Sequence, residues 1–346
     1  NCWPSVEFDC GALANRFSRM LPAGFYYKTF MWPRGAWQWY EKFIRAAAGL
    51  GRTPDAPDPD RYEKRFDHCD VLVVGGGPAG IAAALAAGAA GARVLLVEDR
   101  PEIGAQLRFS GGRIGGTAAG AWWRLACAKL AELPEVRVLT RTTASGYYDH
   151  NLVTLLERVT DHAPPAPTRE PRQRLWKVRA RQVIVATGAT ERPLVFANND
   201  LPGVMLASAA QRYATQYAVR PGSRAVVFAN NGSAYEAALA LVDAGVEIAA
   251  LVDLRARSSM HGLRGLPVRN GQAVVAARGR KSVVAADIAA VDAAGKIVGA
   301  AETIACDLIC VAGGWDPVVH LFSQSGGRLG YDDAQLREQR HPTKAE

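Results

Sequence analysis

A glycine-rich turn between two apolar runs constrains the fold of this chain more than any other feature of the sequence. The segment CDVLVVGGGPAGIAAALAAGAAGARVLLVEDR, residues 69–100, reads as a strand, a tight turn, an alanine-rich helix and a second strand. Gly75, Gly77 and Gly80 have the spacing of a dinucleotide-binding turn, and Glu98 follows at the end of the second strand. This order of elements predicts a doubly wound Rossmann-type sheet that binds a dinucleotide.

Each glycine of the turn has its own expected role. Gly75 permits the tight turn, Gly77 lets a pyrophosphate approach the backbone, and Gly80 allows the helix to pack closely on the strand. The start of the helix offers free N–H groups and a partial positive charge to the phosphates. Glu98 is placed to accept hydrogen bonds from a ribose hydroxyl, and its charge disfavours NADP because the 2′-phosphate would be repelled. The turn alone does not distinguish FAD from NAD.

Two further segments are expected to reach the same crevice. A third strand within VRVLTRTTA ends at Thr143 and Ala144, whose backbone should lie beside the adenine. VIVATGATERP is a further strand, and its Thr187 and Gly188 either bring backbone close to the nucleotide or simply end the strand. We keep both interpretations of Thr187 and Gly188 open.

A second unit, RAVVFANNGSAYEAALAL at residues 224–241, repeats the strand, turn and helix without the glycines. Ala229, Asn231 and Ala234 stand at the three glycine positions. A side chain at Asn231 would occupy the volume of the phosphate, so we expect no dinucleotide here. The sequence therefore predicts an α/β fold of the two-dinucleotide-binding flavoprotein type, in which a second, degenerate Rossmann-like domain is inserted into the first. It argues against a self-contained reductase that passes hydride from NAD(P)H to FAD.

Composition excludes several other classes of protein. The chain has 346 residues, of which 49% are hydrophobic, enough for two domains with sizeable cores. Its six cysteines form no C-x-x-C pair and lie near no histidine cluster, so we expect no metal site and no disulfide framework, as in a cytoplasmic protein. A net charge of +8 comes from scattered arginines, which does not favour nucleic acid as a partner.

The longest apolar window, residues 71–92, is long enough to suggest a membrane helix, but the glycines and proline of the turn interrupt it. We therefore expect no membrane span. The chain begins at Asn1 without a methionine and ends without a closing element, as a fragment of a longer protein would.

Composition shifts divide the chain into four expected parts. Residues 1–66 are an aromatic-rich N-terminal segment and a linker, and the aromatic segment packs either against this chain or against another subunit. Residues 67–206 form the first dinucleotide-binding domain, and residues 207–306 form the degenerate second one. Residues 307–346 return to the first domain, beginning with the strand of CDLICVAGGWDP, and end in a tail.

Several stretches together resemble one family over nearly the whole chain. They are NCWPSVEFD, LPAGFYYKTFMWP, VVGGGPAGIAAALAAG, TTASGYYDHNLV, VIVATGATERPLVFANNDLPGVM, FANNGSAYEAAL and CVAGGWDPVVHLFSQSGG. They are similar to the alpha subunit of heterotetrameric sarcosine oxidase. The resemblance implies NAD in the first site, FAD and the amine-oxidising centre on a beta subunit, and FMN at the interface between alpha and beta.

The resemblance also implies which residues contact the cofactor. The positions that match are Gly75, Gly77, Ala79, Gly80, Glu98, Asp99, Arg100, Gln106 and Ala144. To these we add Pro78 at the helix start, with Thr187 and Gly188, as candidate cofactor-binding residues. This sequence departs from the family in lacking both the residues that precede the equivalent of Asn1 and the C-terminal folate-binding domain.

The resemblance implies an oxidoreductase subunit that takes part in the oxidative demethylation of sarcosine to glycine, formaldehyde and hydrogen peroxide. The small amine would be oxidised on the partner subunit, because this sequence holds no convincing catalytic acid–base pair. We expect structural roles for Asp316 and His320. Two alternatives remain: an FAD-binding subunit of a related amine or opine dehydrogenase, and a truncated assembly module without catalytic function.

Overall fold

In a computed structural model the chain divides into two compact units, residues 1–60 and residues 61–346. The structure describes residues 4–5, 8–13, 30, 32–33, 35–49, 51, 53–108, 110–164, 169–257, 265–292, 294–332 and 337–340. In the first unit, helix α2 spans Trp37–Ala48 and ends at Gly49, whose φ of 71° is left-handed. The ring of Trp39 packs edge-on against Phe43, with 4.8 Å between centroids. Much of the aromatic segment lies outside the described residues, so its partner stays a prediction.

The second unit begins with a six-stranded sheet in the order β5–β2–β1–β8–β7–β6. Strands β5, β2, β1 and β8 run parallel, whereas β7 and β6 are antiparallel to their neighbours. The strands are β1 (Tyr62–Val74), β2 (Val94–Val97), β5 (Val136–Leu139), β6 (Thr142–Tyr148), β7 (Leu152–Arg158) and β8 (Gln173–Val185). The parallel part confirms the predicted α/β sheet, because β1, β2 and β5 are joined through helices α3 (Pro78–Ala89) and α4 (Ala119–Ala131).

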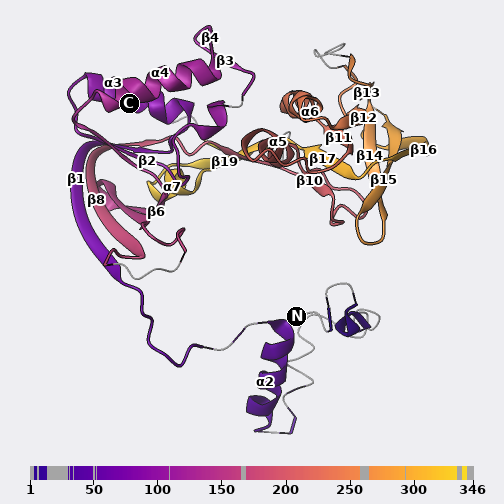
Figure 1. Ribbon diagram of the computed structural model, residues 1–346, viewed down its shortest axis with the longest axis horizontal. Helices are drawn as coiled ribbons and strands as arrows, with labels where there is room; N and C mark the ends of the chain where they lie inside the picture. Colours follow the sequence, from indigo (N-terminus) through magenta and orange to yellow (C-terminus); the bar gives the residue numbers. More distant parts are fainter. Residues whose placement is uncertain are drawn as a thin grey trace. The chain divides into compact units, whose positions relative to one another are not determined.

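Both faces of this first sheet are covered (Figure 1). Helices α3 and α4 pack on one face, where Ile81 and Leu130 meet Val73 and Leu96. Strands β6, β7 and β8 enclose the other core together with the short helix α7 (His320–Gln324), which contributes Leu321. The link between β2 and α4 holds the short elements η2 (Ala105–Arg108), β3 (Arg113–Ile114) and β4 (Thr117–Ala118).

The prediction of one strand through VRVLTRTTA was wrong. β5 ends at Leu139, and Arg141 takes a left-handed φ of 50°. The Thr142 N–H then donates to the Glu98 carbonyl at 2.8 Å, and the chain continues to the opposite edge of the sheet as β6. The turn η3 (Asp149–Asn151) then joins β6 to β7. Both halves of the segment are apolar enough for a strand, so the sequence did not show the break.

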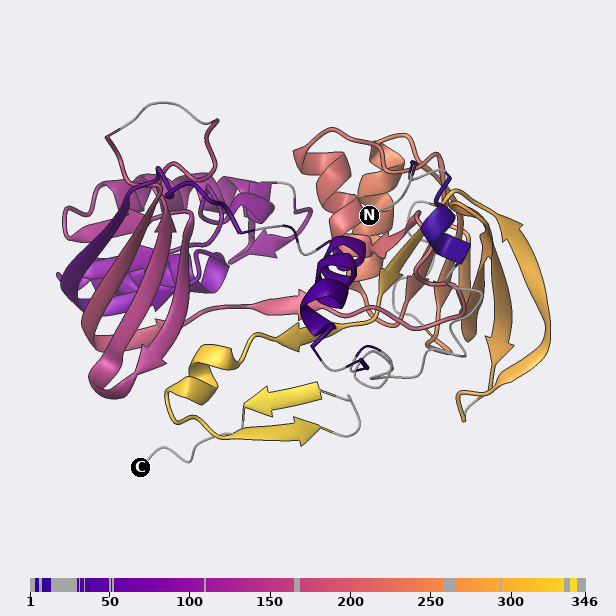
Figure 2. The same ribbon diagram turned by 90° about the horizontal axis from the view of Figure 1, so that it is seen from below.

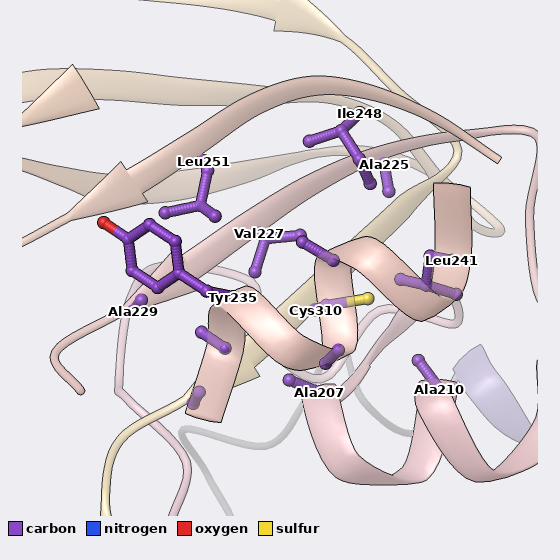
Figure 3. Close-up of a cluster of buried hydrophobic side chains, with 14 of the residues drawn as sticks. Ala207, Ala210, Ala225, Val227, Ala229, Tyr235, Leu241, Ile248, Leu251 and Cys310 are labelled. Atoms are coloured by element: carbon purple, nitrogen blue, oxygen red, sulfur yellow. The ribbon is translucent and has the colours of Figure 1, made fainter. Parts of the chain in front are cut away.

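A second sheet of five parallel strands has the order β10–β17–β11–β12–β13. Its strands are β10 (Val204–Leu206), β17 (Leu308–Ala312), β11 (Arg224–Ala229), β12 (Glu247–Asp253) and β13 (Val268–Asn270). Helices α5 (Ala207–Gln216) and α6 (Ser233–Asp243) cover one face (Figure 2), and Figure 3 shows the core there, with the ring of Tyr235 inside it. An antiparallel meander of β14 (Gln272–Gly279), β15 (Val283–Val291) and β16 (Ile297–Ala305) covers the other.

The expected place of the strand in CDLICVAGGWDP was also wrong. β17 does not rejoin the first sheet but lies between β10 and β11 in the second. β10 belongs there too, although the prediction included it in the first domain. The return to the first sheet comes a few residues later: β18 (Trp315–Pro317) pairs with β9 (Ala189–Glu191), and α7 follows. Both sheets bury their central strands, so an apolar run fits either one.

A hairpin of β19 (Leu329–Asp332) and β20 (Arg337–Arg340) follows α7 (Figure 2). Across the part of the chain that the structure describes, none of the helices combines the length and apolarity that crossing a membrane requires.

The packing of α3 against β5 generates a prediction about Gly88. A Cβ on this buried helical glycine would lie 2.5 Å from Cγ2 of Val136 and 2.9 Å from Cδ1 of Leu133. Alanine normally favours a helix over glycine by about 1 kcal/mol, but overpacking costs about 1–3 kcal/mol. We therefore expect Gly88→Ala to lower the free energy of unfolding in urea. The control Ala86→Gly, at an exposed position of the same helix, measures the difference in helix propensity between alanine and glycine alone. A Gly88→Ala variant that is more stable than wild type would contradict close packing of α3 against β5 at this position.

Candidate functional site

The turn after β1 is shaped by two glycines that the protein itself requires. Gly75 has a φ of +107°, and a Cβ there would lie 2.3 Å from the Ala186 carbonyl oxygen. A Cβ on Gly80 would lie 1.8 Å from the Gly75 carbonyl oxygen. The first glycine thus allows the turn to lie against the end of β8, and the second allows α3 to lie against the turn, as predicted for these positions.

Gly77 differs from both, because nothing in the protein requires its lack of a side chain. It is the residue before α3, its φ of −72° and ψ of −176° suit any residue, and a Cβ would meet no atom within 4 Å. Pro78 and Ala79 form the exposed first turn of the helix. Open space therefore adjoins the N-terminus of α3, where free N–H groups and the helix dipole favour an anion.

Glu98 lies beside this turn. Its Oε2 accepts a hydrogen bond from the Gly76 N–H at 2.7 Å, and its Oε1 accepts one from the Arg100 N–H at 3.1 Å. Burial raises the pKa of Glu98, and a hydrogen bond with the Asp99 side chain raises it further, against the effect of these two N–H groups. The carboxyl group is thus held at the end of β2, next to the glycine turn, with lone pairs left for hydroxyl donors.

The other predicted contact residues gather around the same loop. The Arg100 guanidinium donates to Oε1 of Gln106 at 2.6 Å, and the Asp99 carbonyl accepts from Arg158 at 2.6 Å. Ala144 follows two residues after Thr142, whose N–H is bonded to the Glu98 carbonyl. The chain therefore brings Glu98, Arg100, Gln106 and the start of β6 to one end of β2, although their contact with a nucleotide stays a prediction.

Thr187 and Gly188 lie where β8 leaves the first sheet. The Thr187 hydroxyl donates to the Val318 carbonyl at 2.8 Å, and the Val318 N–H donates to the Gly188 carbonyl at 3.0 Å. These bonds give Thr187 a structural role between the two strands that link the sheets. A Cβ on Gly188, whose φ is +70°, would meet nothing within 4 Å. The geometry leaves room beside Gly188 for a ligand, so both interpretations of the pair stay open.

The second turn, after β11, is filled by the protein's own side chains. Ala229 and Ala234 are fully buried. Oδ1 of Asn231 accepts hydrogen bonds from the Ser233 N–H at 3.0 Å and from the Ser233 hydroxyl at 2.6 Å, while its Nδ2 donates to the Ala312 carbonyl at 3.0 Å. The amide oxygen thus satisfies a donor at the start of α6 that a phosphate would otherwise use.

Three residues that the sequence analysis missed close the rest of the second site. Asp253 ends β12, in the place that Glu98 has after β2, and it is fully buried. The Tyr235 hydroxyl donates to its Oδ2 at 2.9 Å, and Arg255 donates to its two oxygens at 2.9 and 2.7 Å. Burial acts to raise the pKa of Asp253, but the bonds from Arg255 and Tyr235 outweigh it and lower the pKa. The signal was available, because Asp253 follows Ala229 at nearly the spacing from Gly75 to Glu98.

Asp316 and His320, for which structural roles were expected, lie near the links between the sheets. The Asp316 carboxylate is 3.6 Å from the Arg192 guanidinium, and His320 is the exposed first residue of α7. Within the described parts of the chain, no three His, Cys, Asp or Glu side chains come together as a metal site.

Comparison with known proteins defines the class to which this fold and turn belong. Residues 69–334 match the family described as pyridine nucleotide-disulphide oxidoreductase, and the chain belongs to that family. The L-proline dehydrogenase of P. horikoshii has a similar fold, with a TM-score of 0.58 and 21% identity over 85% of this chain and 51% of that one. The predicted two-dinucleotide-binding flavoprotein fold is thereby confirmed.

More particular relatives confirm the resemblance that the motifs carry. The chain is 44% identical to the alpha subunit of sarcosine oxidase from Rhizobium meliloti (strain 1021), over 95% of this chain and 33% of the relative. It is 32% identical to an opine oxidase subunit from Agrobacterium tumefaciens (strain Ach5), over 58% of this chain and 40% of the relative. The chain thus spans about a third of the sarcosine oxidase alpha subunit that it matches.

The open space at Gly77 yields a prediction that separates binding from folding. Gly77→Val should abolish nucleotide retention, with an affinity loss of at least roughly a hundredfold, because its methyl groups would fill the space beside the helix N-terminus. The backbone angles suit valine, so the variant should fold. Gly80→Val, which would clash with the turn itself, should not fold stably. Circular dichroism and nucleotide release measure the two effects, and a folded Gly77→Val with unchanged nucleotide content would refute the assignment.

The filled second turn predicts that the site from Ala229 to Ala234 binds no dinucleotide. Calorimetric titration of the purified chain, with its first site already saturated, should show no further binding of NADH or NADPH at millimolar concentrations. A sulfate or phosphate ion at the start of α6 is compatible with this expectation. One additional stoichiometric dinucleotide would show that Asn231 and Tyr235 do not close the site.

Proposed function

We propose that this chain is the NAD-binding part of an alpha subunit of the heterotetrameric sarcosine oxidase type. The observation that carries the proposal is the contrast between its two turns: the first has open space at Gly77 and a carboxylate beside it, whereas Asn231 and Tyr235 fill the second. Identity of 44% over 95% of the chain to a sarcosine oxidase alpha subunit supports the choice of this type.

The residues of the first turn suit a dinucleotide. Gly77, Pro78 and Ala79 would present the start of α3 to the diphosphate, and Glu98 would accept hydrogen bonds from a ribose hydroxyl. Asp99, Arg100, Gln106 and Ala144 would complete the adenosine side, with Thr187 and Gly188 at the other side of the crevice. Bound NAD would supply a nicotinamide ring able to accept hydride.

The amine chemistry is assigned to a partner. We infer that a beta subunit carries the centre that oxidises sarcosine to glycine, formaldehyde and hydrogen peroxide, and that FMN is shared at its interface with this chain. The relatives support this, because the sarcosine oxidase and opine oxidase proteins that the chain matches are both named as subunits. A cytoplasmic location without nucleic acid or membrane partners completes the proposal, with the domain limits at residues 66, 206 and 306 as working boundaries.

A second candidate is an FAD-binding subunit of an amine or opine dehydrogenase. The open turn fits FAD as well as it fits NAD, because both dinucleotides bind to the same glycine-rich sequence motif. The similarity to the opine oxidase relative extends over 58% of the chain. A truncated assembly module without catalytic function is the third candidate.

The proposal is tested by co-expressing this chain with the beta-type subunit from the same source. Sarcosine-dependent formation of hydrogen peroxide should require both chains, and an opine should not replace sarcosine. Peroxide formation by the partner alone would leave this chain as an assembly module, and activity only with an opine would favour the second candidate.

Glu98 provides a prediction about cofactor choice. Its carboxylate should select the free 2′-hydroxyl of NAD and repel the 2′-phosphate of NADP, so Glu98→Ala should weaken NAD more than NADP. Loss of charge-assisted hydrogen bonds amounts to about 1.5–3 kcal/mol, or roughly ten- to a hundredfold in the affinity for NAD. Titration of both nucleotides into wild type and variant gives the ratio. Equal losses would place Glu98 away from the ribose.

A further inference from the structure

The first half of β1 extends beyond the helices that cover the first sheet (Figure 1). Helices α3 and α4 pack against Val71 and Val73, near the end of the strand. Side chains alternate between the two faces of a strand, so Tyr62, Lys64 and Phe66 lie on the same face of β1. Tyr62 is 57% exposed and Phe66 is 77% exposed. Two aromatic rings are thus presented to solvent on one strand.

This face continues over β8 and β7. Phe66 pairs with Lys177 of β8, and Lys177 pairs with Thr154 of β7. The Lys177 ammonium lies 5.5 Å from the centre of the Phe66 ring, because paired residues of neighbouring strands present their side chains on one face. The even-numbered residues 62–68 of β1 and 152–158 of β7, with the odd-numbered residues 173–179 of β8, form a surface that we call the basic face.

The basic face contains no acidic residue, whereas four of its members are lysine or arginine, namely Lys64, Arg158, Lys177 and Arg179. The acids of the same strand segments lie on the opposite face. There Glu63 and Glu157 accept hydrogen bonds from Arg174, and Asp67 accepts one from Arg137. The opposite face therefore balances its own charges, while the basic face keeps a net positive charge.

The cations of the basic face form no salt bridge with any residue that the structure describes. Arg158 donates to the backbone carbonyl of Asp99 at 2.6 Å, and Arg179 donates to that of His150 at 3.1 Å. A face of uncompensated cations around exposed aromatic rings is typical of a surface that another molecule covers.

A cavity of about 440 Å³ adjoins the basic face at Tyr62. Its charged lining consists of two glutamates and four arginines, which are Glu63, Glu170, Arg61, Arg65, Arg169 and Arg174. The Glu63 carboxylate accepts hydrogen bonds from Arg65 at 2.8 Å and from Arg174 at 2.6 Å. Arg61 donates to the backbone carbonyl of Arg169 at 3.0 Å. The lining thus keeps an excess of positive charge, and it offers an acidic side chain a hollow beside the exposed rings.

We infer that the basic face binds an acidic surface of a partner subunit, with Phe66 as an apolar anchor and a partner carboxylate in the cavity beside Tyr62. This role rests on the proposed function, in which the chain is one subunit of a larger enzyme. Arginine, tyrosine and phenylalanine are enriched in protein interfaces, and charge complementarity selects the partner. Apolar side chains between the cations, such as Leu156 and Leu175, favour a protein over a nucleic acid, because they offer area that an apolar surface can cover.

The test measures binding of this chain to the beta-type subunit from the same source by surface plasmon resonance at two salt concentrations. The combined variant Lys64→Glu with Lys177→Glu should weaken the complex by roughly a hundredfold, mainly through slower association, and should reduce its salt dependence. Phe66→Ala should weaken it by roughly tenfold or more through faster dissociation, because an aromatic anchor is lost.

Two controls match these changes at exposed positions of the second sheet's meander. Arg280→Glu with Lys281→Glu, in the turn between β14 and β15, makes the same change of charge. Ile297→Ala, on β16, removes an apolar side chain that is 61% exposed. Both control variants should bind the partner as wild type does.

The outcomes distinguish this docking role from the proposed function. Absence of binding by the wild-type chain would overturn both. Unchanged affinity in both face variants would overturn only the docking role, as expected if Asp55, Asp58 and Asp60 of this chain cover the face instead. Binding of the wild-type chain to vesicles of anionic phospholipid, lost in the combined variant, would overturn it in favour of a lipid surface. Thermal unfolding checks that the variants are folded, and Lys64→Glu alone replaces the combined variant if that one is not.

Discussion

The close approach of Gly80 to the Gly75 carbonyl is the contact on which the first half of the structure depends. A Cβ at Gly80 would lie 1.8 Å from that oxygen, so no other residue lets α3 start so near the end of β1. This contact places the helix N-terminus over the strand end, beside Glu98. A Cβ at Gly77, between these two glycines, would meet no atom within 4 Å. The shape of the turn thus depends on the close packing of its backbone at Gly75 and Gly80.

The second turn shows what the same scaffold becomes when the glycines are replaced. Asn231 accepts a hydrogen bond from the Ser233 N–H at the start of α6. The side chains of Tyr235 and Arg255 donate hydrogen bonds to the carboxylate of Asp253. The Ser233 N–H at the start of α6 and the Asp253 carboxylate at the end of β12 thus both have internal partners in the second turn. The strand, the helix and their core do not depend on glycines in the turn, because buried apolar side chains such as Val227 and Leu241 hold them together (Figure 3).

The sequence predicts the structure correctly where the spacing of residues is compatible with only one backbone geometry. The glycine turn, the helix after it and Glu98 all lie as their pattern predicts, because a side chain at Gly75 or Gly80 would clash with backbone. The sequence does not predict the structure where two strand arrangements fit the same hydrophobic pattern. The strand at residues 308–312 is apolar enough for the centre of either sheet, and only pairing with β10 and β11 decides between them. The contacts of Tyr235 and Arg255 with Asp253 depend on side chains that meet only after α6 has packed on β12.

The central claim is that one turn of this chain is open to a dinucleotide and the other is closed by its own side chains. Native mass spectrometry of the purified full chain counts the nucleotides per polypeptide and identifies them by mass. The account predicts a single bound dinucleotide, with the mass of NAD. Two nucleotides per chain, or none at saturating NAD and FAD, would contradict it.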